Sequence, residues 1–173
     1  MTWKRFARVL IRKSQRALEI ARHDLTRGDF DGAVNRSYYA MFDIARAVLL
    51  RAGITEDKLP RTHNGVIEVF HRRAVLSELL DQQLAGDLSR TQSLRIRADY
   101  TDLEVEPKTA TVVVAKAVLF VREVERAFGL EQSSLATGYE NNDPDHDDKV
   151  SETLDVGPQP MSFEEERRQA REN

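Results

Sequence analysis

The chain reads Asn35-Arg36-Ser37-Tyr38-Tyr39-Ala40-Met41-Phe42 over residues 35–42, and this stretch decides the fold. It belongs to a longer segment in which apolar side chains recur mostly at steps of three and four residues, from Phe30 to Leu49. Such periodicity is typical of an amphipathic helix with one buried stripe. Asp29 can cap the start of this helix and Gly53 can end it, so we expect helix between these two residues.

Helical periodicity continues on both sides of this segment, from residue 6 to residue 128. The other expected helices cover residues 6–25, 63–72, 78–98 and 107–128, with Gly28, Thr62, Pro107 and Gly129 as signals at their ends. The β-branched residues 109–114 would also suit a strand, but the sequence offers no partner strand. Short connections between long helices predict an all-α, antiparallel bundle of four to five helices.

The C-terminal part of the chain differs from the rest in composition and charge. Residues 1–130 hold 22 Lys and Arg against 17 Asp and Glu, whereas residues 131–173 hold 4 against 12. A stretch this rich in Asp, Asn, Ser, Gly and Pro cannot bury enough apolar surface to offset its ordering entropy. We therefore expect one helical domain over 1–130 and an acidic, mostly disordered tail over 131–173. A capping-box spacing that begins at Ser162 predicts a short helix over 162–172 within that tail.

Composition narrows the classes of function. The chain has no cysteine, which excludes disulfides, thiolate metal sites and a cysteine nucleophile. Its four histidines show no spacing typical of a metal site, so we expect neither metal nor cofactor. No apolar run approaches the roughly 20 residues that cross a bilayer, and the first residues lack the features of a signal peptide. We expect a cytoplasmic protein without membrane segments.

Arg95 is the charged residue that fits a plain helical core least well. It lies four residues after Thr91 and seven after Leu88, at the border of the apolar stripe, and a buried guanidinium requires a partner. Asp99, four residues further, is one candidate, although this order near a helix C-terminus opposes the macrodipole. On a regular helix Tyr100 would lie about 140° around from Arg95, so joint action requires the helix to end or bend before Tyr100.

The helix that contains residues 35–42 carries a polar strip beside its apolar one. Arg36, Tyr39 and Asp43 are spaced by three and four residues and share a face. Tyr38 lies on the apolar side. Both tyrosines could be core aromatics with hydroxyls at the edge, and Arg36 could pair with Asp43 or with a neighbouring helix. The spacing alone favours this structural interpretation.

Three segments together resemble the HEPN family of small helical proteins. They are residues 35–50, the segment His63-Asn64-Gly65-Val66 with Phe70, and Arg95-Ile96-Arg97-Ala98-Asp99-Tyr100. The resemblance covers about residues 10–128 and implies a HEPN-type bundle that commonly forms a homodimer. Many relatives are toxins of toxin–antitoxin pairs, encoded beside a nucleotidyltransferase antitoxin, and act as metal-independent ribonucleases. The resemblance thus implies RNA as substrate and a nucleotidyltransferase as partner.

The usual active motif of the family is Arg-x(4-6)-His, and its arginine corresponds to Arg95. Its histidine is replaced by Tyr100, the fifth residue after Arg95. RNA cleavage without metal needs a base for the 2′-hydroxyl, an acid for the leaving oxygen and positive charge near the phosphate. Tyrosine, which titrates near pH 10, is a poor base, so Asp99 would supply the base or orient Arg95. His63 is the one candidate for a substitute acid or base, or it packs at a helix start.

The predicted site residues follow from this comparison. The expected catalytic residues are Arg95, Asp99 and Tyr100, and the expected substrate-binding residues are Arg36, Tyr39, His63 and Arg97. Because the histidine is replaced, a second hypothesis is a non-catalytic module that binds a nucleotide or docks a nucleotidyltransferase. A third is a polar network with a purely structural role at a dimer interface.

Overall fold

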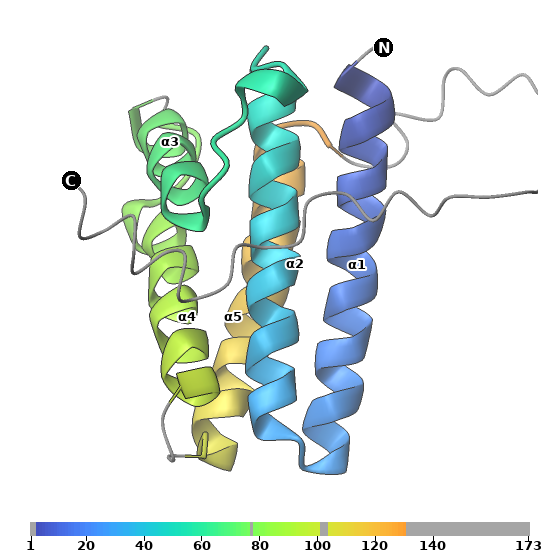
Figure 1. Cartoon of the computed structure of the whole chain (residues 1–173), viewed down its shortest axis with the longest axis vertical. Helices are drawn as coiled ribbons and strands as arrows, with labels where there is room; N and C mark the ends of the chain where they lie inside the picture. The colour runs from blue at the N-terminus through green and yellow to red at the C-terminus, as the bar shows by residue number, and fades with distance from the viewer. Residues whose placement is uncertain (1–2, 77, 101–103, 131–173) are drawn as a thin grey trace, which may run out of the picture. The chain divides into compact units, whose positions relative to one another are not determined.

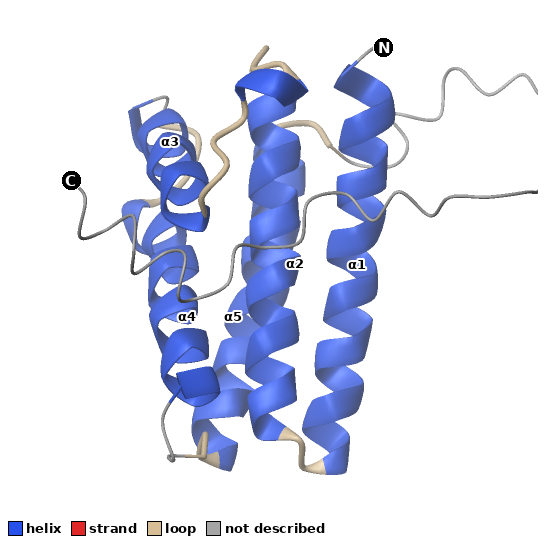
Figure 2. Cartoon of the chain, in the orientation of Figure 1, coloured by secondary structure: helices blue, strands red, loops and turns tan. Residues whose placement is uncertain are grey.

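The computed structural model describes residues 3–76, 78–100 and 104–130. The helices in these ranges are α1 (Trp3–Arg27), α2 (Phe30–Arg51), α3 (His63–Leu76), α4 (Gln82–Tyr100) and α5 (Pro107–Ala127), with a 3-10 turn at Glu56–Lys58. Figures 1 and 2 show this part of the chain as helices joined by loops, without a strand. The predicted all-α bundle is confirmed. The predictions for residues 131–173, including the helix at 162–172, lie outside the described residues.

Local sequence signals set several helix ends. Asp29 caps α2, and its side chain accepts a hydrogen bond from the backbone N–H of Gly32 at 2.8 Å. Gly28 ends α1 with a φ of 80°, a conformation that costs glycine little. The hydroxyl oxygen of Thr62 accepts from the backbone N–H of Gly65 at 3.1 Å at the start of α3. The expected caps of these three helix ends are confirmed.

The bounds of α3 and α4 differ from the predicted ones. α3 runs past the expected break near residue 73. α4 begins later than predicted because Glu78 has a positive φ of 53° and Asp81 caps the helix, accepting from the backbone N–H of Gln83 at 2.8 Å. α4 also continues through Tyr100. The predicted helix end before Tyr100 is wrong, and the backbone of Tyr100 lies about 140° around the helix from Arg95.

α2 occupies the middle of the bundle. It packs against α1 on one side, α3 and α4 on the other, and α5 behind (Figure 1). The main core joins Tyr38, Met41 and Ile44 of α2 to Phe70 of α3 and Phe120 of α5, and all five side chains are fully buried. The central position of α2 brings its polar residues into contact with α3 and α4.

α1 is amphipathic. It buries Ala7, Ile11 and Ala21 in the interior and carries charged side chains on the outer face. In the described ranges, none of the helices combines the length and the apolar character needed to cross a membrane.

Candidate functional site

Arg95 of α4 lies against the two tyrosines of α2. Its guanidinium carbon is 5.8 Å from the centre of the Tyr38 ring and 5.7 Å from that of the Tyr39 ring. Both distances are within the range of cation–π attraction. The Arg95 side chain is only 19% exposed, in agreement with its predicted position at the border of the apolar stripe. A positive charge is therefore held at the edge of an aromatic group.

Asp99 is the ionic partner of Arg95. Its Oδ2 lies 2.8 Å from the Nε of Arg95, one helical turn away. The two groups form a close ion pair without hydrogen-bond geometry, because the buried Nε of Arg95 has no hydrogen-bond partner within the described residues. The side-chain amide of Asn35 on α2 donates to Oδ1 of Asp99 at 3.4 Å, near the long limit for a hydrogen bond. Asp99 therefore links Arg95 of α4 to Asn35 of α2.

His63, the first residue of α3, completes the group. Its Nδ1 lies 2.7 Å from the hydroxyl of Tyr38, which is fully buried and therefore needs such a partner. The imidazole also stacks on the ring of Phe42, with the ring centres 4.4 Å apart. His63 does pack at a helix start, and the same contacts fix the orientation of its ring beside Tyr38 and Tyr39.

The structure brings together a subset of the predicted site residues. We call the tyrosine cluster the group formed by Asn35, Tyr38, Tyr39, His63, Arg95 and Asp99. Arg36 is exposed, and among residues 3–76, 78–100 and 104–130 no hydrogen bond or ion pair joins it to the cluster. Arg97 is also exposed and lies about 200° around α4 from Arg95. The side chain of Tyr100 is outside the described part of the chain.

Sequence reasoning did not assign Asn35 and Tyr38 to the site. Tyr38 was expected in the core, and it is buried there, yet its hydroxyl also holds His63. Asn35 precedes Tyr38 and Tyr39 by three and four residues, so its place on the same face of α2 could have been inferred. The sequence did not indicate the contact between Tyr38 and His63, because the periodicity of one helix does not show which residue of another helix packs against it.

Asp43 and Arg46 lie one turn beyond the tyrosine cluster on α2. The guanidinium carbon of Arg46 is 6.0 Å from the centre of the Phe42 ring, and its Nη1 is 3.8 Å from Oδ1 of Asp43. Burial raises the pKa of Asp43 above its ordinary value, although the nearby charges of Arg46 and Lys13 oppose this effect. The partner of Asp43 is therefore Arg46, and the suggested pairing with Arg36 is wrong.

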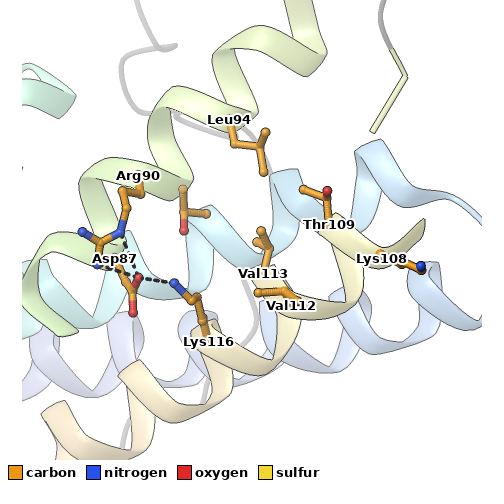
Figure 3. A pocket seen from close by; sticks show the side chains of 9 residues that line it. Asp87, Arg90, Leu94, Lys108, Thr109, Val112, Val113 and Lys116 are labelled. Carbon is orange, nitrogen blue, oxygen red and sulfur yellow. Dashed lines mark hydrogen bonds and ion pairs between the residues drawn. The ribbon is translucent and has the colours of Figure 1, made fainter. Parts of the chain in front are cut away.

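A second polar group lies between α4 and α5, beside a cavity of about 320 Å³ (Figure 3). Asp87 accepts hydrogen bonds from Lys116 at 2.9 Å and from Arg90 at 2.8 Å. Burial raises the pKa of the Asp87 carboxyl, but these hydrogen bonds outweigh it and leave the pKa below its ordinary value. The rest of the wall is largely apolar, with Leu94 and Val112 in view. These charges satisfy one another and connect α4 to α5, which is a structural role.

The described residues contain no group of three His, Asp or Glu side chains placed to hold a metal ion.

Comparison with known proteins gives consistent matches. A sequence profile of the HEPN domain matches residues 7–151, a range that includes the whole tyrosine cluster. A candidate toxin of Methanocaldococcus jannaschii is 28% identical over 127 residues, which cover 73% of this chain and 84% of that protein. A second candidate toxin of this organism is 29% identical over 120 residues, covering 65% and 87%. A UPF0332 protein of Archaeoglobus fulgidus is 30% identical over 118 residues, covering 68% and 90%.

Proposed function

The chain belongs to the HEPN domain family, and from this premise we propose that it is a toxin-like, metal-independent ribonuclease whose antitoxin partner is a nucleotidyltransferase. Relatives named as candidate toxins support the toxin-like part of the proposal. The observation that carries the ribonuclease part is the tyrosine cluster, in which a sheltered guanidinium and an oriented imidazole lie on the same pair of tyrosines. We further propose that the protein acts as a homodimer.

In this proposal Arg95 binds the scissile phosphate. Its ion pair with Asp99 at 2.8 Å and its contacts with the two tyrosine rings hold the guanidinium in one place before substrate arrives. A preorganised charge at a partly desolvated site stabilises the developing negative charge more strongly than a mobile charge in water would. Asp99 thereby acts as a positioning residue for Arg95.

His63 takes the role of the family histidine that Tyr100 replaces. The Tyr38 hydroxyl engages Nδ1, so we assign proton transfer to Nε2 of His63. Histidine is the side chain that most often serves as a general acid or base at neutral pH. In the proposed reaction Nε2 of His63 accepts the proton of the 2′-hydroxyl, whose oxygen attacks the adjacent phosphorus. The bond from phosphorus to the 5′-oxygen breaks, and the protonated imidazole returns the proton to the departing 5′-oxygen. The products are a 2′,3′-cyclic phosphate and a 5′-hydroxyl.

The remaining predicted residues have supporting roles. Tyr39 lines the same edge as Arg95 and is half-buried, so it can contact a bound nucleotide. Arg36 and Arg97 remain proposed substrate contacts, and Tyr100 remains a proposed catalytic residue.

One observation favours a second function. The groups at the centre of the tyrosine cluster are already paired with one another, Arg95 with Asp99 in an ion pair and Tyr38 with His63 in a hydrogen bond. A site of this kind is also suited to binding without turnover. The alternative proposal is a non-catalytic module whose cluster binds a nucleotide or docks the nucleotidyltransferase.

Incubation of the purified protein with total RNA in the presence of EDTA separates the two. The ribonuclease proposal predicts cleavage that falls about 100-fold or more in Arg95→Ala, because a preorganised charge has been removed. Arg72→Ala is a matched control, since Arg72 is an exposed arginine of α3 paired with Glu68. Absence of cleavage together with binding of a nucleotide or of the partner would favour the non-catalytic module.

A further inference from the structure

The outer face of α1 carries a line of arginines. Arg5, Arg8, Arg12 and Arg16 follow one another at steps of three, four and four residues. These steps confine them to a sector of about 80° and a length of about 16 Å along the helix. Arg5, Arg12 and Arg16 are exposed, and Arg8 is half-buried. We call these four residues the α1 basic ridge.

The charge of the ridge is not balanced by acidic side chains on α1. Lys4 adds to it, Lys13 lies near Asp43 of α2, and the first acidic residue of the chain is Glu19. In the described part of the chain, no hydrogen bond or ion pair involves the side chains of Arg5, Arg12 or Arg16. Three other exposed arginines have ion-pair partners, Arg72 with Glu68, and Arg122 and Arg126 with Glu123, whereas single arginines such as Arg36 and Arg61 have none in the described residues; the ridge differs from these in its regular line of like charges.

Helix stability does not account for this arrangement. Like charges four residues apart on a helix repel one another. Positive side chains in the first turns also oppose the helix macrodipole, and the first turn of α1 has no acidic residue to compensate. A helix selected only for stability would carry acidic residues at these positions. The ridge is therefore better explained by a negatively charged partner.

We propose that the α1 basic ridge docks the phosphate backbone of single-stranded RNA, at a surface separate from the tyrosine cluster. The choice of RNA as the polyanion rests on the proposed function. A regular line of guanidinium groups suits a polymer of evenly spaced phosphates, which guanidinium binds through paired hydrogen bonds. An acidic protein would need an apolar centre in the interface, and of the apolar side chains described on α1 only Val9 is exposed.

The ridge and the tyrosine cluster are independent parts of the molecule. The cluster residues belong to α2, α3 and α4, and α1 contributes none of them. The ridge would hold the substrate strand and raise its local concentration, whereas the cluster would act on one phosphate. Loss of the ridge should therefore weaken RNA binding and leave the chemical step at saturating RNA unchanged.

The test measures binding of a fluorescent 20-nucleotide 2′-O-methyl RNA by anisotropy over a series of salt concentrations. This probe lacks the free 2′-hydroxyl, so it is not cleaved whether or not the protein is a nuclease. The ridge variant carries Arg5→Gln, Arg12→Gln and Arg16→Gln. Each phosphate contact contributes about 0.7 to the slope of log K against log salt for single strands, so the slope should fall by about 2.

A matched control removes the same charge from arginines that have ion-pair partners. It carries Arg72→Gln, Arg122→Gln and Arg126→Gln, and its slope should change by less than about 0.7. Equal slopes in the two triple variants would overturn the proposal. Ridge-dependent binding of poly-glutamate with ridge-independent binding of RNA would also overturn it, and would identify an acidic protein as the partner.

Circular dichroism distinguishes docking from a structural role. Removal of mutually repelling charges should leave the helix content and Tm of the ridge variant unchanged or higher, and a lower Tm would contradict the proposal. The single reversal Arg12→Glu repeats the binding test with minimal change. If RNA binding depends on the ridge but unmodified RNA is not cleaved, the ribonuclease proposal is refuted and the ridge proposal stands. If unmodified RNA is cleaved but its binding does not depend on the ridge, the ridge proposal is refuted and the ribonuclease proposal stands.

Discussion

Tyr38→Phe removes one hydroxyl from the centre of the tyrosine cluster and leaves the ring in place. Tyr38 is fully buried, and its hydroxyl lies 2.7 Å from Nδ1 of His63. Loss of one such hydrogen bond costs about 0.5 to 1.5 kcal/mol. His63 is only half-buried, so water can replace part of the interaction and we expect about 1 kcal/mol. For a domain of this size that corresponds to a decrease in Tm of about 3 to 5 °C.

The same substitution should slow RNA cleavage through His63. Without the hydroxyl, the imidazole loses one of the contacts that fix its orientation, and a small displacement of a catalytic group lowers the rate substantially. We expect kcat to fall about 10-fold, which is similar to the loss when a residue that hydrogen-bonds a metal-ligating histidine is replaced. KM should stay the same, because a fully buried side chain cannot contact RNA.

A double-mutant cycle with His63→Ala provides the assay, with unfolding in urea and cleavage of a defined RNA as the two measurements. If Tyr38 acts through His63, its hydroxyl should have no effect on cleavage once the imidazole is removed. Ser37→Ala is the control, since Ser37 is buried on the same helix and its hydroxyl has no hydrogen-bond partner within the described ranges. The reasoning is refuted if Tyr38→Phe and Ser37→Ala have the same effect on stability and kcat, or if the Tyr38 effect on kcat persists in the His63→Ala background.

Three further predictions concern stability. Because burial raises the pKa of Asp43, its carboxyl favours the folded state only while it is protonated. Asp43→Asn should therefore increase the free energy of unfolding at pH 7 and lose this advantage below about pH 4. Urea unfolding over a pH series measures this, and a variant less stable than the wild type at pH 7 would contradict it. The lowered pKa of Asp87 has the opposite effect on the pH dependence of stability. The stabilisation by its carboxylate is present above about pH 4 and is lost as pH falls through the lower folded-state pKa. Asp87→Asn should therefore lower the free energy of unfolding by about 1 to 2 kcal/mol at pH 7 and by less at pH 3. The value at pH 7 is modest because Arg90 and Lys116 are half exposed. An equal decrease at both pH values would disprove the role of the charge. Gly28→Ala should cost about 1 kcal/mol from its φ of 80° alone, because no atom lies within 4 Å of the added methyl group, and an unchanged Tm would argue against that backbone conformation.

The fold could be predicted from sequence to the extent that local signals determine it. The N-cap at Asp29 and the helix end at Gly28 depend on residues within one turn, and both are where the sequence places them. The start of α4 could not be placed, because Glu78 adopts a left-handed conformation that non-glycine residues rarely adopt. Glu78 is exposed, and neither glycine nor asparagine stands at this position to signal such a conformation in the sequence.

A site residue could be predicted where its charge does not fit the apolar stripe of its own helix. Arg95 interrupts an apolar stripe and Asp99 lies one turn away, so both could be identified before their contact was known. Tyr38 and His63 are 25 residues apart and on different helices, and helical periodicity specifies a face but not the element that packs on it. Arg36 shows the opposite case, because spacing placed it beside Tyr39 although it is exposed and has no bond to the cluster within the described residues.

The most direct measurement is cleavage of a defined single-stranded RNA in EDTA, with the ends of the products analysed by mass spectrometry. If Arg95 and His63 act as proposed, the wild-type protein releases fragments with 2′,3′-cyclic phosphate and 5′-hydroxyl ends. Arg95→Ala and His63→Ala should each retain their fold and cleave about 100-fold more slowly or worse. Absence of cleavage by the wild-type protein, or an undiminished rate in Arg95→Ala, would contradict the assignment of the tyrosine cluster as a ribonuclease site.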